Sequence, residues 1–305
     1  MKSSSSSTLL GYLSIVASAI IFGIMPLMAN FIYAEGVDSV SLVFFRNLFS
    51  LPPLLALALI SGRSLKIPVK NLPPIIVLAV FGCAATPLLL FSSYNYLESG
   101  TATVLHFIYP VAVIAIELLV FRASVRWANV LSIALCIIGM LLFYSPGGEL
   151  NGVGSILTIS SGITYAIYIC LLGRFKRKEI DSFVFSFYIT LIATISIGIV
   201  CIISGEITFP KTLAGWLVCG FFAIVVNVGA VVLFQRGTFI IGGEKAAILS
   251  TFEPITSVIV GIVAFGETFG ILTVLGTLLI ISAGVIIAVS DIIAKKKKSP
   301  MPEIK

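Results

Sequence analysis

Charged residues are what this sequence has least of. Asp, Glu, Lys and Arg make up only 10% of its 305 residues, whereas 59% are hydrophobic and the mean hydropathy is +1.17. Soluble domains carry about 25% charged residues. A chain with so few charges lacks the polar side chains to cover a folded surface in water, so the composition predicts a membrane protein.

Histidine and cysteine are also scarce, and their placement excludes several kinds of site. The chain has one histidine, His106, and five cysteines that fall inside apolar runs without the close spacing of metal ligands. It contains no Gly-Lys-Ser/Thr phosphate loop, no His-Glu-x-x-His and no Gly-x-Ser-x-Gly. We therefore expect no metal, no cofactor and no ATP-driven step within this chain, and we do not expect an enzyme.

Apolar runs separated by Gly and Pro breaks predict ten transmembrane helices. The predicted spans are roughly 9–33, 39–61, 74–97, 101–121, 127–144, 153–173, 183–204, 213–235, 246–266 and 269–290. If the N-terminus is cytoplasmic, 17 of the 19 Lys and Arg residues fall on the cytoplasmic side. This bias predicts a multi-pass plasma-membrane protein with both termini in the cytoplasm, so the formal charge of +6 reflects orientation and does not indicate nucleic-acid binding.

The sequence repeats itself with a period near 143 residues. Asp38–Ser39 aligns with Asp181–Ser182, and, with a shift of one, Tyr109–Pro110 aligns with Glu253–Pro254. Each half holds five spans, and an odd number gives the halves opposite orientations in the membrane. The predicted fold is therefore an all-α membrane protein of ten transmembrane helices arranged as two inverted five-helix repeats. We expect a disordered lead at 1–8, repeats at 9–147 and 148–291, and a basic cytoplasmic tail at 292–305.

These features resemble the EamA family of the drug/metabolite transporter superfamily over essentially the full length. The resemblance is carried by Phe45–Arg46–Asn47, by the run from Ala246 to Pro254 and by Gly266–Glu267. The first half departs from the pattern, with Phe121–Arg122–Ala123 in place of Phe265–Gly266–Glu267. The resemblance implies a ten-helix carrier that moves small metabolites, often amino acids or related compounds, sometimes outward.

Glu253 is the most informative polar residue, because it lies in an apolar run long enough to cross a bilayer. A carboxylate at that depth costs roughly 2.5–3.5 kcal/mol, so it is normally paired, protonated or facing a water-filled cavity. Ser250, Glu253 and Ser257 share one helix face, beside the break expected at Pro254. Two interpretations stay open: a group that binds substrate or a proton, and a structural hydrogen bond.

The repeat pairs His106 with Ser250 and Tyr109 with Glu253, so the two half-sites are expected to form one cavity. His106 is a candidate proton relay or, alternatively, an interhelical hydrogen-bonding group. Arg46 is a candidate carboxylate anchor. Alternatively it is a structural side chain that reaches the membrane interface or pairs with a helix C-terminus. For Glu117 we expect a local ion pair with Arg122.

Further hydroxyl, amide and aromatic side chains in the spans indicate an aromatic-lined, moderately polar cavity, suited to zwitterions or flat heterocycles. The substrate-binding candidates among them are Ser18, Phe22, Tyr165, Tyr168 and Asn227. The predicted function is a secondary active transporter that works by alternating access. Proton coupling through Glu253 is a hypothesis, and the alternatives are an uncoupled facilitator of the same fold and an intramembrane enzyme. The expected partners are a small-molecule substrate, membrane lipids and protons, and the expected assembly is a monomer or homodimer.

Overall fold

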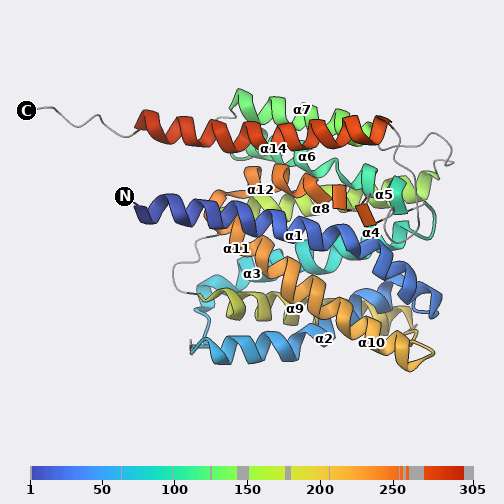
Figure 1. Ribbon diagram of the computed structural model, residues 1–305. Coiled ribbons are helices and arrows are strands. Elements are labelled where there is room, and N and C mark those ends of the chain that lie inside the picture. The colour runs from blue at the N-terminus through green and yellow to red at the C-terminus, as the bar shows by residue number, and fades with distance from the viewer. Residues whose placement is uncertain are drawn as a thin grey trace, which may run out of the picture.

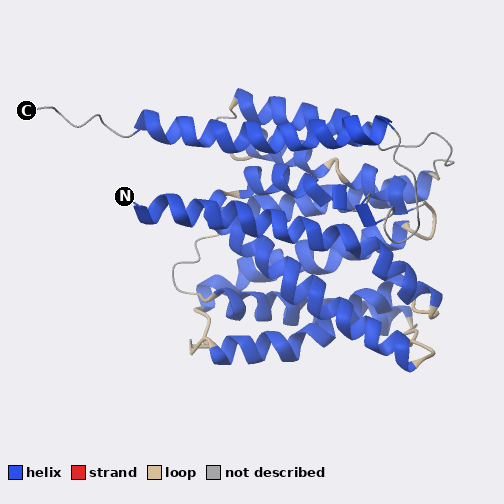
Figure 2. Ribbon diagram, viewed as in Figure 1, coloured by secondary structure: helices blue, strands red, loops and turns tan. Residues whose placement is uncertain are grey.

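The computed structural model of the chain describes residues 2–62, 64–97, 99–123, 126–142, 151–175, 180–205, 207–253, 255–256, 259–260 and 271–298. Within these ranges the regular secondary structure is helical, the helices are joined by loops and turns, and there is no strand (Figure 2). The helices lie side by side in one elongated bundle, and both ends of the chain emerge at the same end of it (Figure 1).

The first half of the bundle contains α1 (Lys2–Ala34), α2 (Ser39–Ile60), η1 (Val69–Asn71), α3 (Leu72–Leu78), η2 (Ala79–Ala85), α4 (Thr86–Ser93), α5 (Ser99–His106), α6 (Tyr109–Leu119) and α7 (Trp127–Leu141). The second half contains α8 (Gly152–Arg174), α9 (Ser182–Ser204), α10 (Leu213–Phe222), η3 (Ala223–Val231), α11 (Val232–Ile241), α12 (Gly243–Leu249), η4 (Ser250–Phe252) and α14 (Ile271–Lys298). Helix α2 packs along α9, and α7 packs along α14.

Six helical segments of the described chain are long and apolar enough to cross a membrane. They are Ser7–Ala34, Ser39–Ile60, Val69–Ser93, Gly152–Arg174, Ser182–Ser204 and Leu213–Ile241. Shorter apolar helices cover Tyr109–Leu119, Trp127–Gly139 and Val274–Ile286. The fold is therefore that of an all-helical, multi-pass membrane protein, as the composition predicts.

Both ends of the helical region extend beyond the predicted boundaries. Helix α1 already begins at Lys2, within the stretch 1–8 that was expected to be a disordered lead. Helix α14 continues to Lys298, into the predicted basic tail. Neither extension contains an internal proline or glycine to stop the helix.

Equivalent helices in the two halves begin in the same way. Asp38 caps α2 by accepting a hydrogen bond from the Ser41 amide at 2.7 Å. Asp181 caps α9 by accepting one from the Phe183 amide at 2.9 Å. Each cap satisfies an amide that the first turn of a helix leaves without a partner. The Asp-Ser pairs that align in the sequence are therefore two copies of one helix start.

Two predicted spans are not continuous helices. The predicted span 101–121 consists of α5 and α6, which are separated at Phe107–Ile108 where Pro110 opens the second helix. The predicted span 246–266 starts as α12 and passes into the 3-10 turn η4 before Glu253. The part of this span from 261 onward, with Gly266 and Glu267, lies outside the described residues, as does Pro254.

The third and eighth spans each contain a π-helical segment, η2 and η3. A π turn leaves some carbonyls without the usual helical partner and is frequent at functional sites. Pro87 follows η2 and has no amide hydrogen to donate to the Cys83 carbonyl. The Asn47 amide of α2 donates to that carbonyl instead, at 3.2 Å.

Candidate functional site

A cavity lies inside the bundle. Its empty volume is about 560 Å³ when the solvent at its opening is included. Both halves of the chain line the cavity. The first half contributes Phe22, Met25, Arg46, Gly82, Cys83, Thr86, Pro87, Leu90 and His106, and the second contributes Tyr165, Tyr168, Val231, Phe234 and Glu253.

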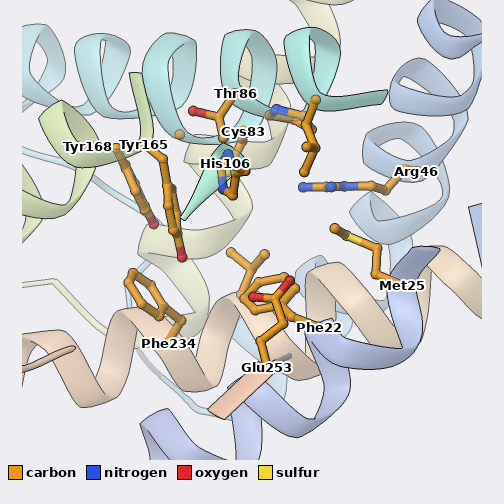
Figure 3. Close-up of a pocket in the computed structure, with 14 residues that line it drawn as sticks. Phe22, Met25, Arg46, Cys83, Thr86, His106, Tyr165, Tyr168, Phe234 and Glu253 are labelled. Carbon is orange, nitrogen blue, oxygen red and sulfur yellow. The ribbon is translucent and has the colours of Figure 1, made fainter. Parts of the chain in front are cut away.

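Two side chains of opposite charge face this cavity. Arg46 extends its guanidinium into it from α2, and Glu253 extends its carboxylate into it from the end of η4 (Figure 3). Arg46 is only 4% exposed, and its Nε has no hydrogen-bond partner within the described part of the chain. Its side chain therefore does not reach the membrane interface. A buried guanidinium with an unused donor is a ready site for an anionic group.

A buried network of amides holds the backbone beneath Arg46. Asn227, in η3, donates to the Arg46 carbonyl at 3.1 Å and lies 3.1 Å from the Ser50 hydroxyl. Asn47 donates to the carbonyls of Val43 at 2.9 Å and Cys83 at 3.2 Å. These bonds tie α2 to both π segments, so they fix the position from which the guanidinium extends.

Aromatic rings form one wall of the cavity. The rings of Tyr165 and Tyr168, on α8, are stacked with centroids 6.0 Å apart, and the Tyr168 ring is also stacked with Phe234 of α11 at 6.2 Å. His106 stacks on Tyr165 at 5.6 Å, and its Nδ1 lies 2.9 Å from the Ser161 hydroxyl. Such a wall favours a flat or apolar body between the two charges.

A glycine allows this wall to pack closely against η2. A Cβ added at Gly82 would come within 2.3 Å of the Tyr168 ring. Real Cβ atoms do not approach other atoms so closely, so any side chain here would displace the ring or the segment.

Six of the side chains selected from the sequence line the cavity: Phe22, Arg46, His106, Tyr165, Tyr168 and Glu253. Their rings and charged groups, contributed by four helices and the end of η4, converge on one space (Figure 3).

The other candidates lie behind the cavity wall or outside the described residues. Tyr109 is fully buried, with its ring 4.9 Å from that of Tyr165. Ser18 donates to the Ala230 carbonyl at 2.8 Å, and Ser250 donates to the Ala246 carbonyl at 2.9 Å. Asn227 belongs to the amide network described above. Ser257 lies outside the described residues.

The expected ion pair between Glu117 and Arg122 is wrong, because Glu117 pairs with Arg174. Both carboxylate oxygens of Glu117 accept hydrogen bonds from the Arg174 guanidinium. The guanidinium also lies 3.6 Å from the centre of the Phe121 ring. Helix α8 packs beside α6, so a partner distant in the sequence is closer than the local one. This pair joins the two halves of the chain.

Several lining residues were not selected from the sequence, notably Gly82, Cys83, Thr86 and Phe234. The Thr86-Pro87 pair was a usable signal, since a proline inside a span frees a carbonyl. The Thr86 hydroxyl lies 2.7 Å from the Phe81 carbonyl and 2.9 Å from the Thr164 hydroxyl. Within the described ranges, no group of three or more His, Cys, Asp or Glu side chains is placed to hold a metal ion.

Comparisons with known proteins agree with this architecture. An uncharacterized transporter of Archaeoglobus fulgidus is 29% identical over 91% of this chain and 96% of its own length. The uncharacterized inner membrane transporter YicL of Salmonella typhimurium is 26% identical over 93% of this chain and 97% of its own. A protein of known crystal structure has a TM-score of 0.74 over 97% of this chain and 99% of that one, and at 18% identity this likeness shows the fold alone.

The model of the EamA-like transporter family matches the chain twice, at residues 9–145 and 152–289. The two matches together cover nearly the whole sequence, and they coincide with the two halves of the internal repeat. Both relatives are named as transporters, and this chain aligns with almost the full length of each. The chain belongs to the EamA-like transporter family, within the drug/metabolite transporter superfamily.

Proposed function

We propose that this membrane transporter is a secondary carrier of ten spans, whose two inverted halves rock against each other around the central cavity. In such carriers the substrate site lies where the halves meet, and discontinuous helices shape it. The breaks between α5 and α6 and at η4 support this architecture, since one lies in each half beside the cavity.

The positions of the irregular segments support an inverted repeat. The π segments start at Ala79 and Ala223, and the helix breaks lie next to His106 and Ser250. Both pairs are separated by the repeat period of the sequence. Two halves with the same irregularities at matching positions have the same internal design, as alternating access between repeats requires.

One observation carries the substrate class: Arg46 and Glu253 line the same cavity as a wall of aromatic rings. A guanidinium binds a carboxylate bidentately, and a carboxylate binds an ammonium group. Aromatic faces bind an apolar or flat body. The matching ligand is a small zwitterion such as an amino acid, with its carboxylate at Arg46 and its ammonium group at Glu253.

Glu253 also offers a route for coupling to protons. A carboxyl group that is protonated on one side of the membrane and ionised on the other links substrate movement to a proton gradient. His106 lines the same cavity and is the other candidate for a proton relay. A facilitator of the same fold would use the same cavity without this link.

The orientation follows from the basic loops. Both chain ends lie at one end of the bundle (Figure 1), and the loops predicted to share that side hold most of the Lys and Arg residues. We place this end in the cytoplasm of a cell whose plasma membrane the protein crosses.

The substrate class is tested by binding to the purified protein. L-phenylalanine carries both charges and an aromatic ring, phenethylamine lacks the carboxylate, and 3-phenylpropionate lacks the amine. We expect L-phenylalanine to bind at least tenfold more tightly than either analogue, because each analogue lacks one of the two charged groups that the cavity is proposed to bind. Equal binding of the zwitterion and one analogue would refute the two-charge site.

A further inference from the structure

A short chain of polar groups lies behind the aromatic wall and reaches the cavity at Tyr168. The Ser186 hydroxyl of α9 lies 2.6 Å from Oε1 of Gln235, on α11. Nε2 of Gln235 lies 3.2 Å from the Tyr168 hydroxyl oxygen. Ser186 and Gln235 are each only 1% exposed, so these two polar groups are buried away from solvent. Tyr168, in contrast, lines the cavity.

The hydrogen bonds from Ser186 through Gln235 to Tyr168 can run in either of two directions. The two contact distances at the Gln235 amide distinguish these directions. If the Gln235 amide were turned around, its nitrogen would lie 2.6 Å from Ser186 and its oxygen 3.2 Å from Tyr168. Bonds from N–H to oxygen measure about 2.7–3.2 Å, and bonds from O–H to oxygen about 2.5–3.0 Å. The Ser186 hydroxyl also lies 2.9 Å from the Ser182 carbonyl, so its one hydrogen has two acceptors, and the shorter contact favours donation to Oε1 of Gln235. The longer contact then fits an amide N–H of Gln235 that donates to the tyrosine oxygen.

A tyrosine hydroxyl has one hydrogen, so its direction depends on its neighbours. An amide oxygen at Gln235 would attract that hydrogen, whereas an amide N–H takes up a lone pair of the hydroxyl oxygen. With Nε2 donating to Tyr168, the tyrosine hydrogen is left free to point away from Gln235. Figure 3 shows the Tyr168 and Tyr165 rings side by side at the cavity, with their hydroxyls on the side of Phe234.

We propose that Ser186 and Gln235 orient the Tyr168 hydroxyl as a hydrogen-bond donor to an acceptor group on the transported molecule. This inference rests on the proposed function for the cavity as a substrate site, and it names Gln235 as a positioning residue and Tyr168 as a specificity-determining residue. A neutral donor adds a directional contact for a carboxylate or carbonyl without adding charge to the cavity. Arg46 supplies the charge, and Tyr168 restricts where the acceptor sits.

The amide orientation is tested first, without a ligand. In a deuterated sample with protonated Tyr and Ser and ¹⁵N-labelled Gln, the Gln235 side-chain signal is identified by its loss in Gln235→Leu. We expect nuclear Overhauser contacts from the amide hydrogens of Gln235 to the Tyr168 ring. Contacts to the Ser186 methylene group, with none to Tyr168, would show the reversed chain and overturn the inference.

Binding then tests the role in specificity. Tyr168→Phe removes only the hydroxyl, and we expect it to weaken L-phenylalanine binding roughly 10- to 100-fold, as the loss of a hydrogen bond to a charged group does. Binding of phenethylamine, which lacks the acceptor, should be unchanged. The control is Tyr188→Phe, which removes a hydroxyl that donates to the Leu65 carbonyl, outside the cavity lining.

The outcomes separate this inference from the proposed function. If Tyr168→Phe weakens both probes equally, or neither, the donor role is wrong even though the cavity binds zwitterions. If the wild type does not bind L-phenylalanine more tightly than phenethylamine, the two-charge site fails, and the amide contacts alone decide how Tyr168 is oriented.

Discussion

Arg46 and Glu253 determine which ligands the cavity can hold, because they are its only Arg, Lys, Asp or Glu side chains among the residues described as lining it. From the sequence, Arg46 is either a carboxylate anchor or a structural side chain that reaches the interface or pairs with a helix C-terminus. Its burial and its direction into the cavity favour the anchor.

Arg46→Lys tests whether Arg46 anchors a carboxylate. Lysine keeps the positive charge but lacks the planar fork that binds both carboxylate oxygens. We expect L-phenylalanine affinity to fall roughly tenfold or more, since one charge-assisted hydrogen bond is lost. Isothermal titration of purified protein measures this, with Arg236→Lys as a control at an exposed arginine. Unchanged affinity would assign Arg46 a structural role.

Glu253→Gln tests the coupling hypothesis. Glutamine keeps the shape and one acceptor oxygen but does not ionise, so the variant should fold and lose any response to a proton gradient. It should still bind the substrate, but more weakly, because the ammonium group then has a neutral acceptor in place of a carboxylate. The measurement is substrate flux into liposomes with and without an imposed pH gradient. If wild-type flux ignores the gradient, the carrier is a facilitator. If wild type and Glu253→Gln respond equally, coupling lies elsewhere, and His106 is the next residue to test.

At the scale of elements, the π segment η2 and helix α8 form one packed unit through Gly82. Gly82→Ala places a Cβ against the Tyr168 ring, which must then move together with its neighbours. Overpacking of this kind costs about 1–3 kcal/mol. We expect a lower apparent melting temperature in detergent and weaker ligand binding.

Gly220→Ala is the matched control for this prediction. It makes the same chemical change inside helix α10, where an added Cβ meets nothing within 4 Å. Its melting temperature should be unchanged or higher, since alanine favours helix by up to about 1 kcal/mol over glycine. Equal behaviour of the two variants would show that the close approach at Gly82 does not matter.

The same elements show how far the sequence can predict this structure. Apolar runs predicted the six long spans of the described chain, because membrane spans need a continuous hydrophobic length. The π segments were not predicted, since their stability depends on distant groups such as Asn47, which satisfies the Cys83 carbonyl. The ion pair of Glu117 with Arg174 was missed for the same reason, as it depends on how α6 and α8 pack.

The candidate site was predictable where a polar residue is costly in a membrane and therefore conspicuous. Arg46, His106 and Glu253 stood out in this way, and all three line the cavity. Serine was a weaker guide, because Ser18 and Ser250 satisfy their hydroxyls on nearby backbone carbonyls. Glycine and alanine positions such as Gly82 gave no signal, since their role appears only in the packing.

For the whole molecule, the basic loops predict which end faces the cytoplasm. The loop after α2 lies at the end that holds both termini, and the loop before α10 lies at the opposite end (Figure 1). In a variant without native cysteines, Leu213→Cys should react with an impermeant thiol reagent added to intact cells, whereas Ser64→Cys should react only after permeabilisation. The reverse pattern would invert the proposed orientation.

We propose that the cavity between the two halves carries a small zwitterion across the membrane. Tracer exchange in proteoliposomes, run over a panel of amino acids and nucleobases, measures this transport. We expect saturable exchange of at least one zwitterion by the wild type and its loss in Arg46→Ala. No exchange above protein-free liposomes for any zwitterion, or equal exchange by Arg46→Ala, would contradict it.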